Sequence, residues 1–181
     1  MKQPLVSVSL ALALLAGPTA FAATAKPLTA HADLKTAKGV SLGKATLTQT
    51  PHGVEVKVEL SQLTEVAKSP ELAIHVHETG KCEGPDFKSA GGHFNPTGKE
   101  HGFSNPKGHH AGDTAKPLAM SKTGEAHATF LLADVTLETG KPNSLLKDGG
   151  TSFVIHDGQD DQKSQPAGNS GNRVVCGVIE N

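Results

Sequence analysis

The sequence predicts an all-β fold, an antiparallel sandwich or flattened barrel of eight strands. Three observations predict it. Short runs of alternating apolar and polar residues dominate the chain, segments with the period of a helix are hard to find, and turn residues separate the runs. Eight short strands separated by turns are typical of this architecture.

The predicted strands begin shortly after the N-terminal segment. The clearest is 54–60, in which four apolar residues share one face and the charged residues share the other. Pro51-His52-Gly53 and Thr123-Gly124 have the composition of hairpin turns. The eight predicted strands are 28–34, 40–48, 54–60, 72–78, 117–121, 125–132, 152–157 and 173–179.

Two connections, residues 79–116 and 158–172, are much longer than the others. Loops of this length without secondary structure of their own are usually functional or disordered. Each directly follows a predicted strand that carries histidine. We therefore expect both loops to be functional.

The N-terminus, residues 1–22, has the pattern of a secretory signal peptide. Lys2 is followed by an apolar run, residues 5–16, that is too short to span a membrane, and Ala20-Phe21-Ala22 forms a small-x-small cleavage site. A retained anchor helix is the alternative. The mature chain, residues 23–181, has the length of one domain and contains no further apolar run of about 18 residues, so we expect no membrane span after cleavage.

The formal net charge of −1 at pH 7 gives no case for binding nucleic acid or an anionic membrane surface. Neither is therefore expected as a partner.

The segment 75–113 contains six of the ten histidines among Gly, Pro, Asn, Ser and Lys. It has too few large apolar residues to be ordered by a core, so metal coordination is the expected ordering agent. His75 and His77 alternate with apolar residues on a predicted strand, which puts both imidazoles on its outer face, roughly 7 Å apart at Cα. Further donors follow at His93, His101, His110 and Asp113, and at His156 near the C-terminus.

These donors suggest two metals. Imidazoles from two strands suit a redox-active copper, whereas a His/Asp set on a loop suits zinc, which has no redox chemistry. The alternative is a histidine-rich surface loop that acquires metal incidentally.

Cys82 and Cys176 are the only cysteines. In an exported protein an even number of cysteines implies a disulfide, and only one intramolecular pairing exists. Two free thiols or a bond between chains are the alternatives. A bond here would attach the first long loop to the last predicted strand.

The chain resembles copper/zinc superoxide dismutase of the bacterial, exported kind over most of its mature length. The resemblance is densest in the following motifs: His75-Val-His77-Glu, Ser89-Ala-Gly-Gly-His93-Phe-Asn-Pro, His101-Gly, His110-Ala-Gly-Asp113, Val154-Ile-His156 and Gly171-Asn-Arg173-Val-Val-Cys176. It implies a Greek-key barrel, a periplasmic location, and one copper and one zinc per subunit. Family members occur as monomers and as homodimers, and the sequence leaves both open.

The resemblance also implies the role of each donor. His93 is expected to be shared by the two metals. Asp160 is expected to connect a copper histidine to a zinc histidine, with its neighbour Asp161 as the alternative. His110 is preferred to His109, which is expected to face solvent, because His-x-x-Asp is the family's spacing. The expected copper ligands are His75, His77, His93 and His156, and the expected zinc ligands are His93, His101, His110 and Asp113.

The implied function is the dismutation of superoxide to dioxygen and hydrogen peroxide in a two-step redox cycle. Arg173 is expected to hold the anion, and His93 to supply a proton. A strand-end arginine facing water is the alternative for Arg173. A periplasmic copper or zinc binding or delivery protein on the same scaffold is the alternative function, and it would need neither Arg173 nor a shared imidazole.

Overall fold

The structure is a computed structural model that describes residues 26–181. The predicted signal peptide, residues 1–22, lies outside the described residues. Within them, the only regular elements are β-strands and two single-turn 3-10 helices, η1 (Leu63–Glu65) and η2 (Lys88–Ala90). No helix among the described residues is long and apolar enough to cross a membrane.

Nine strands form two sheets. A curled seven-stranded sheet has the order β5-β8-β9-β1-β2-β3-β7, and β4 pairs with β6 in a second, two-stranded sheet. Every pair is antiparallel. The strands are β1 (Thr29–Thr36), β2 (Ser41–Thr50), β3 (Gly53–Leu60), β4 (Glu71–Leu72), β5 (Ile74–His77), β6 (Leu118–Ala119), β7 (Ala126–Leu132), β8 (Ser152–His156) and β9 (Arg173–Val178).

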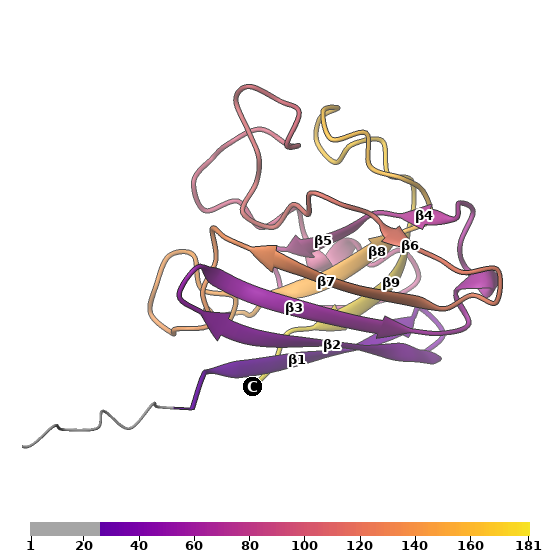
Figure 1. Ribbon diagram of the computed structural model, residues 1–181, viewed down its shortest axis with the longest axis horizontal. Helices are drawn as coiled ribbons and strands as arrows, with labels where there is room; N and C mark the ends of the chain where they lie inside the picture. The colour runs from indigo at the N-terminus through magenta and orange to yellow at the C-terminus, as the bar shows by residue number, and fades with distance from the viewer. Residues whose placement is uncertain (1–25) are drawn as a thin grey trace, which may run out of the picture.

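The long sheet curls so that β1, β2, β3 and β7 form one wall and β5, β8 and β9 lie behind it (Figure 1). β1 and β3 alternate buried and exposed residues, and β7 alternates buried or half-buried residues with exposed ones. Their buried side chains pack with those of β5 and β8 into one apolar core that includes Leu47, Val56, Ile74, Phe153 and Ile155. Because each strand buries one face, apolar and polar residues alternate along it, and this alternation allowed the strands to be predicted from the sequence.

The predicted all-β Greek-key fold is confirmed. The predicted strand 72–78 is wrong in one respect, because it is broken into β4 and β5 at Ala73. There the main chain changes partner: the Ala73 N–H donates to Gly158 O at 2.8 Å, and Ala73 O accepts from the His156 N–H at 2.9 Å. The strand therefore leaves β6 and joins β8 at this residue.

The two long loops lie over the same side of the barrel (Figure 1), although they leave opposite ends of the antiparallel pair of β5 and β8. Residues 79–116 follow β5, and residues 158–172 follow β8, which is the hydrogen-bonded neighbour of β5. Figure 1 shows both loops above the strands, at the top of the molecule. This arrangement places both loops over the histidines of β5 and β8.

Candidate metal centre

Three of the predicted ligands are held by neighbouring strands. His75 and His77 lie on β5, and His156 ends β8, which is paired with β5. All three are buried, with His75 and His77 at 0% exposure. The predicted site on the outer face of the sheet is therefore closed off from solvent, because the long loops cover that face.

The first long loop is hydrogen-bonded to β5 by its main chain. The N–H of Phe94 donates to Val76 O at 2.8 Å, the N–H of Val76 donates to Gly112 O at 2.8 Å, and the N–H of Gly112 donates to Phe94 O at 2.9 Å. A Cβ at Gly112 would collide with the Val76 carbonyl, so this close approach requires glycine. These main-chain hydrogen bonds bring His93, which precedes Phe94, and His110, two residues before Gly112, close to the histidines of β5.

The predicted donors meet in two groups that share one residue. His93 belongs to both, and in each group four ligand atoms lie within 4.8 Å of one another. Its ring centroid is 4.1 Å from that of His75 and 5.3 Å from that of His110. The first group is His75, His77, His93 and His156, and the second is His93, His101, His110 and Asp113.

Hydrogen bonds fix which ring nitrogen carries the proton. His77 Nδ1–H donates to Gly91 O at 3.0 Å, and His156 Nδ1–H donates to Gly171 O at 3.2 Å. His75 uses Nε2–H instead, which donates to Asp160 at 2.7 Å. Each imidazole therefore turns its other, unprotonated nitrogen toward the shared centre.

Those inward nitrogens are the ones that a metal would use. Within the described residues, five buried ring nitrogens have no hydrogen-bond partner: His75 Nδ1, His77 Nε2, His93 Nε2, His101 Nδ1 and His156 Nε2. Buried polar atoms are rarely left unpaired. Four of the five belong to the first group, whose all-imidazole set suits copper, and the His₃Asp set of the second suits zinc. The residues present therefore fit both ions.

Asp113 organises the second group. Its Oδ1 lies 2.7 Å from His93 Nδ1, and its Oδ2 lies 3.0 Å from His101 Nδ1. Oδ2 also accepts the main-chain N–H groups of Gly102 at 2.9 Å and His110 at 3.0 Å. One carboxylate thus fixes three loop segments around the donors of the second group.

Asp160 connects the two groups from outside. Its Oδ2 accepts from His75 Nε2 at 2.7 Å, and its Oδ1 accepts from His101 Nε2 at 3.0 Å. Asp161, the alternative at this position, is exposed and accepts the N–H groups of Lys163 and Ser164 instead. Only Asp160 reaches both groups.

The pKa values in the first group favour the neutral, metal-binding form of imidazole. Burial lowers the pKa of His75 to about 3, helped by the charge of His93 and opposed by Asp160. Burial likewise lowers the pKa of His156 to about 4, and it lowers the pKa values of His77 and His93. Near neutral pH these nitrogens keep their lone pairs.

In the second group the imidazole of His101 is paired with the carboxylates of Asp113 and Asp160. Burial alone would lower the pKa of His101, but Asp113 and Asp160 outweigh it and raise that pKa to about 9. Burial opposes ionisation of Asp113, but its histidine neighbours hold its pKa far below the usual range. Zinc binding at His101 would therefore displace a proton.

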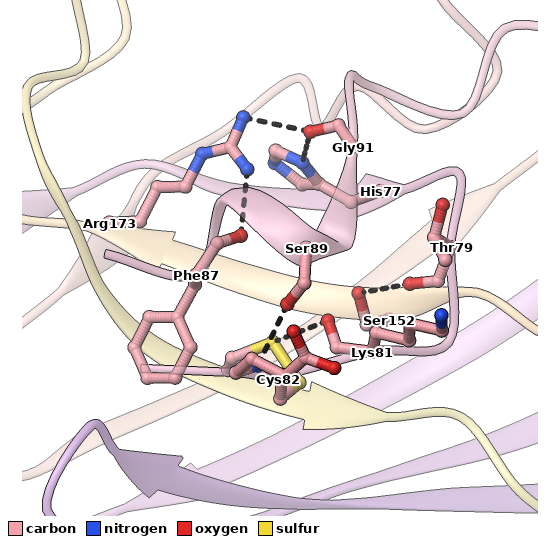
Figure 2. Close-up of a disulfide and its surroundings, with 11 residues drawn as sticks. His77, Thr79, Lys81, Cys82, Phe87, Ser89, Gly91, Ser152 and Arg173 are labelled. Carbon is pink, nitrogen blue, oxygen red and sulfur yellow. Dashed lines mark hydrogen bonds between the residues drawn. A yellow bond between two sulfur atoms is a disulfide. The ribbon is translucent and has the colours of Figure 1, made fainter. Parts of the chain in front are cut away.

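Arg173 begins β9 opposite His156, at an irregularity in the β8–β9 ladder. Its Nη1 donates to Phe87 O at 2.9 Å, and its Nη2 donates to Gly91 O at 2.8 Å, both in the first long loop (Figure 2). These are the only hydrogen bonds of its guanidinium within the described residues. The half-buried cation therefore keeps donors available for a small anion.

The predicted disulfide between Cys82 and Cys176 is confirmed, and the described residues contain no free cysteine. It joins the first long loop to β9, three residues after Arg173 (Figure 2). Cys176 packs with Phe87, Ala90 and Val154 in a small apolar cluster that Cys82 borders. The bond thus holds the loop whose carbonyls bind Arg173.

The remaining histidines lie outside both groups. His31, His52 and His127 are exposed, as expected. The solvent-facing position predicted for His109 is only partly correct: its ring is half-buried and stacks on Phe103 at a centroid distance of 3.7 Å, because both side chains lie on the same loop.

Sequence reasoning missed several residues that orient the site. The Gly91 carbonyl binds both His77 and Arg173, and the side chain of Gln165 binds the main chain of His101. These interactions involve main-chain atoms, which any residue offers, so no motif marks them.

Comparisons with known proteins agree with this geometry. The copper/zinc superoxide dismutase family profile matches residues 41–179. A copper/zinc superoxide dismutase of Aquifex aeolicus is 52% identical over 156 residues, which cover 86% of this chain and 90% of the relative. A crystal structure of a double mutant of a superoxide dismutase-like protein from Bacillus subtilis has a TM-score of 0.78 at 38% identity, covering 83% and 97% of the two chains. The copper/zinc superoxide dismutase of Brucella abortus has a TM-score of 0.64 at 24% identity, covering 84% and 100%, and shares the fold.

Proposed function

The chain belongs to the copper/zinc superoxide dismutase family, and on that premise we propose which of its residues perform the reaction. The protein is an enzyme that converts superoxide to dioxygen and hydrogen peroxide, with copper and zinc as its cofactors. We assign copper to His75, His77, His93 and His156, and zinc to His93, His101, His110 and Asp113.

The observation that carries this assignment is the position of His93 in both donor groups. Its Nε2 has no hydrogen-bond partner within the described residues, and its Nδ1 lies among the donors of the second group, 2.7 Å from Asp113 and 3.3 Å from His110. A storage site needs no shared imidazole. A redox centre whose reaction takes up protons can use one, because His93 Nε2 can hold a proton and deliver it to the product.

Bound copper supplies the change of oxidation state, and bound zinc supplies charge and order without redox chemistry. The protein's own residues hold the ligand imidazoles in fixed orientations. Asp160 holds His75 and His101 in fixed tautomers, and Gly91 and Gly171 do the same for His77 and His156. Burial of the imidazoles keeps water away from the donor nitrogens.

We assign anion binding to Arg173. Its guanidinium is fixed at two points by Phe87 O and Gly91 O, and the Gly91 carbonyl also binds the copper-group residue His77. A small anion bound to the remaining N–H groups would therefore lie beside the first donor group. A planar guanidinium binds such an anion by directed hydrogen bonds as well as by charge.

Paired single variants test the assignment. We expect His156→Ala to lose copper and dismutation while keeping zinc, and His110→Ala to lose zinc more than copper, as measured by metal analysis after loading and by superoxide consumption. His127→Ala, at an exposed histidine of β7, is the matched control. Normal metal content in both ligand variants would refute the assignment.

We also propose that residues 1–22 direct export and that the mature enzyme, residues 23–181, works in the periplasm. The disulfide supports an oxidising compartment. Fractionation of expressing cells, with N-terminal sequencing of the periplasmic product, tests this. A product that starts at Met1 or stays in the cytoplasm would refute it.

A further inference from the structure

Two glutamines of the second long loop hold the segment that carries the predicted zinc ligands. Gln165 Oε1 accepts the main-chain N–H of His101 at 2.9 Å, and Gln165 Nε2 donates to the carbonyl of His101 at 3.1 Å. A single side-chain amide therefore occupies both main-chain groups of one residue. The two residues are 64 positions apart in the sequence.

His101 needs such a partner because it lies in no strand or helix. The residue is completely buried, and Gln165 is the only partner of its N–H among the described residues. Buried main-chain groups must be paired, and in an irregular loop a side chain has to supply what a neighbouring strand supplies in a sheet. Gln165 does this for His101.

Gln162 makes the second set of contacts, at two points of the first long loop. Its carbonyl accepts the N–H of Ser104 at 3.0 Å, and its Nε2 donates to the carbonyl of Thr114 at 3.0 Å. Thr114 directly follows the ligand Asp113. Gln162 approaches the first loop so closely that a Cβ at Gly102 would collide with its carbonyl.

The main chain of Gln162 also orients the carboxylate between the two metal groups. Its N–H donates to Asp160 Oδ1 at 2.6 Å, the oxygen that contacts His101 Nε2. The second loop therefore holds His101 at its imidazole through Asp160 and at its main chain through Gln165. Gln162 holds the far end of the ligand segment.

We propose that Gln162 and Gln165 are positioning residues for the zinc site and act as a latch between the two long loops. The latch rests on the zinc ligand set proposed above. Neither glutamine ligates a metal, yet both set the geometry in which His101 and Asp113 meet zinc. By linkage, zinc that favours the latched state must in turn hold the second loop in place.

Zinc affinity of the metal-free full chain tests the latch, measured by competition with a chromophoric chelator. Outer residues that orient ligands typically contribute 10- to 100-fold to metal affinity. Because Gln165 is exposed and water can partly replace it, we expect about a tenfold increase in the zinc dissociation constant for Gln165→Ala. Gln162→Ala removes the side-chain bond to Thr114 O but keeps the main-chain bonds to Ser104 and Asp160, so we expect a smaller increase for that variant. Copper affinity should be unchanged. Gln159→Ala, exposed in the same loop and without a side-chain hydrogen bond among the described residues, is the matched control.

Amide hydrogen exchange in the presence and absence of zinc distinguishes the latch from a role in fold stability alone, because only the latch couples zinc binding to the order of the second loop. Zinc should slow exchange of the Asp161 and Gly168 amides, which bond within the second loop to Gly168 O and Ser164 O. In the two latch variants this zinc-dependent protection should be lost, while it persists in Gln159→Ala.

The outcomes separate the latch from the zinc site itself. If His101→Ala abolishes zinc binding while both latch variants bind zinc as the wild type does, the latch is refuted and the site stands. Equal loss of zinc and copper affinity, with a lower melting temperature, would also refute it, as general destabilisation. If His101→Ala binds zinc normally, the assigned zinc site fails and the latch with it.

Discussion

His77 and Arg173 share one hydrogen-bond acceptor, the carbonyl oxygen of Gly91. His77 Nδ1–H donates to it at 3.0 Å and Arg173 Nη2–H at 2.8 Å, although Gly91 and Arg173 are 82 residues apart in the sequence. The shared carbonyl fixes both the tautomer of His77, a histidine of the first group, and the direction of the Arg173 guanidinium. A shift of the loop at Gly91 would therefore disturb both.

Arg173→Glu tests the anion-binding role. We expect kcat/KM for superoxide to fall roughly 10- to 150-fold at low ionic strength, because a charge-assisted hydrogen bond of about 1.5–3 kcal/mol is lost and a repulsive charge is added. Both metals should stay bound, and the ionic-strength dependence of kcat/KM should weaken. Lys57→Glu makes the same charge change on the exposed face of β3 and serves as the control. Equal activity of the Arg173 variant at low salt would contradict the role.

The disulfide should stabilise the fold measurably. Cys82 and Cys176 are separated by 94 residues, and closing a loop of that size is worth roughly 4.5 kcal/mol in the chain-entropy model. We expect the Cys82→Ser, Cys176→Ser double variant to melt roughly 10 °C lower than the oxidised wild type by calorimetry. Reduced wild type is the control, and it should match the variant. A melting temperature unchanged by either treatment would rule out this contribution.

Gly168 should be irreplaceable beside Asp160. It has φ +65°, and a Cβ there would collide with Asp160 Oδ1 and approach His101 Nε2 to 2.7 Å. We expect Gly168→Ala to displace the Asp160 carboxylate and to raise the zinc dissociation constant at least tenfold, as measured by chelator competition. Gly98→Ala is the matched control, because Gly98 has the same φ with no atom within 4 Å of its Cβ position. Both variants share the backbone strain, so equal zinc affinities would contradict the collision.

The metal-free protein should be most stable near pH 6 to 7. The pKa values of His75 and His156 are about 3 and about 4 when folded, below the ordinary 6.5. The unfolded chain therefore binds protons below pH 6.5 that the folded chain does not, and the free energy of unfolding falls by roughly 3 kcal/mol per histidine by pH 4. His101 acts in the opposite sense: its folded pKa of about 9 contributes stability below pH 6.5 that is lost as pH rises through 9.

Urea unfolding of the metal-free protein from pH 4 to pH 10 measures this profile. His156→Gln should remove about one proton from the slope between pH 6.5 and pH 4 and leave the alkaline side unchanged. A stability that rises steadily from pH 6.5 to pH 9 would contradict the raised pKa of His101.

The strands were predictable because each buries one face, so apolar and polar residues alternate along the sequence. β3, with its alternation of buried and exposed residues, lies within one residue of the predicted run 54–60. The break at Ala73 could not be predicted, because it reflects a change of hydrogen-bonding partner from β6 to β8, and apolar residues continue through it.

The donor residues were predictable by type and spacing, because few residue types bind copper or zinc and their order along the chain is informative. Their assignment to individual ions stays a prediction, supported by the two groups that meet at His93. The resemblance favoured Asp160 over Asp161, but residue type alone cannot separate two adjacent aspartates, which differ only in the direction of their side chains. The fold directs Asp160 inward and leaves Asp161 exposed.

The sequence by itself determined the fold class, the candidate donors and the one possible intramolecular pairing of cysteines, because periodicity, residue chemistry and a count of two cysteines are properties of the chain. Only the tertiary structure decided that Gly91 orients His77 and Arg173, that Asp160 joins the two groups, and that Gln165 holds His101. These contacts join residues 14 to 85 positions apart, and most use main-chain carbonyl or N–H groups that every residue type presents alike.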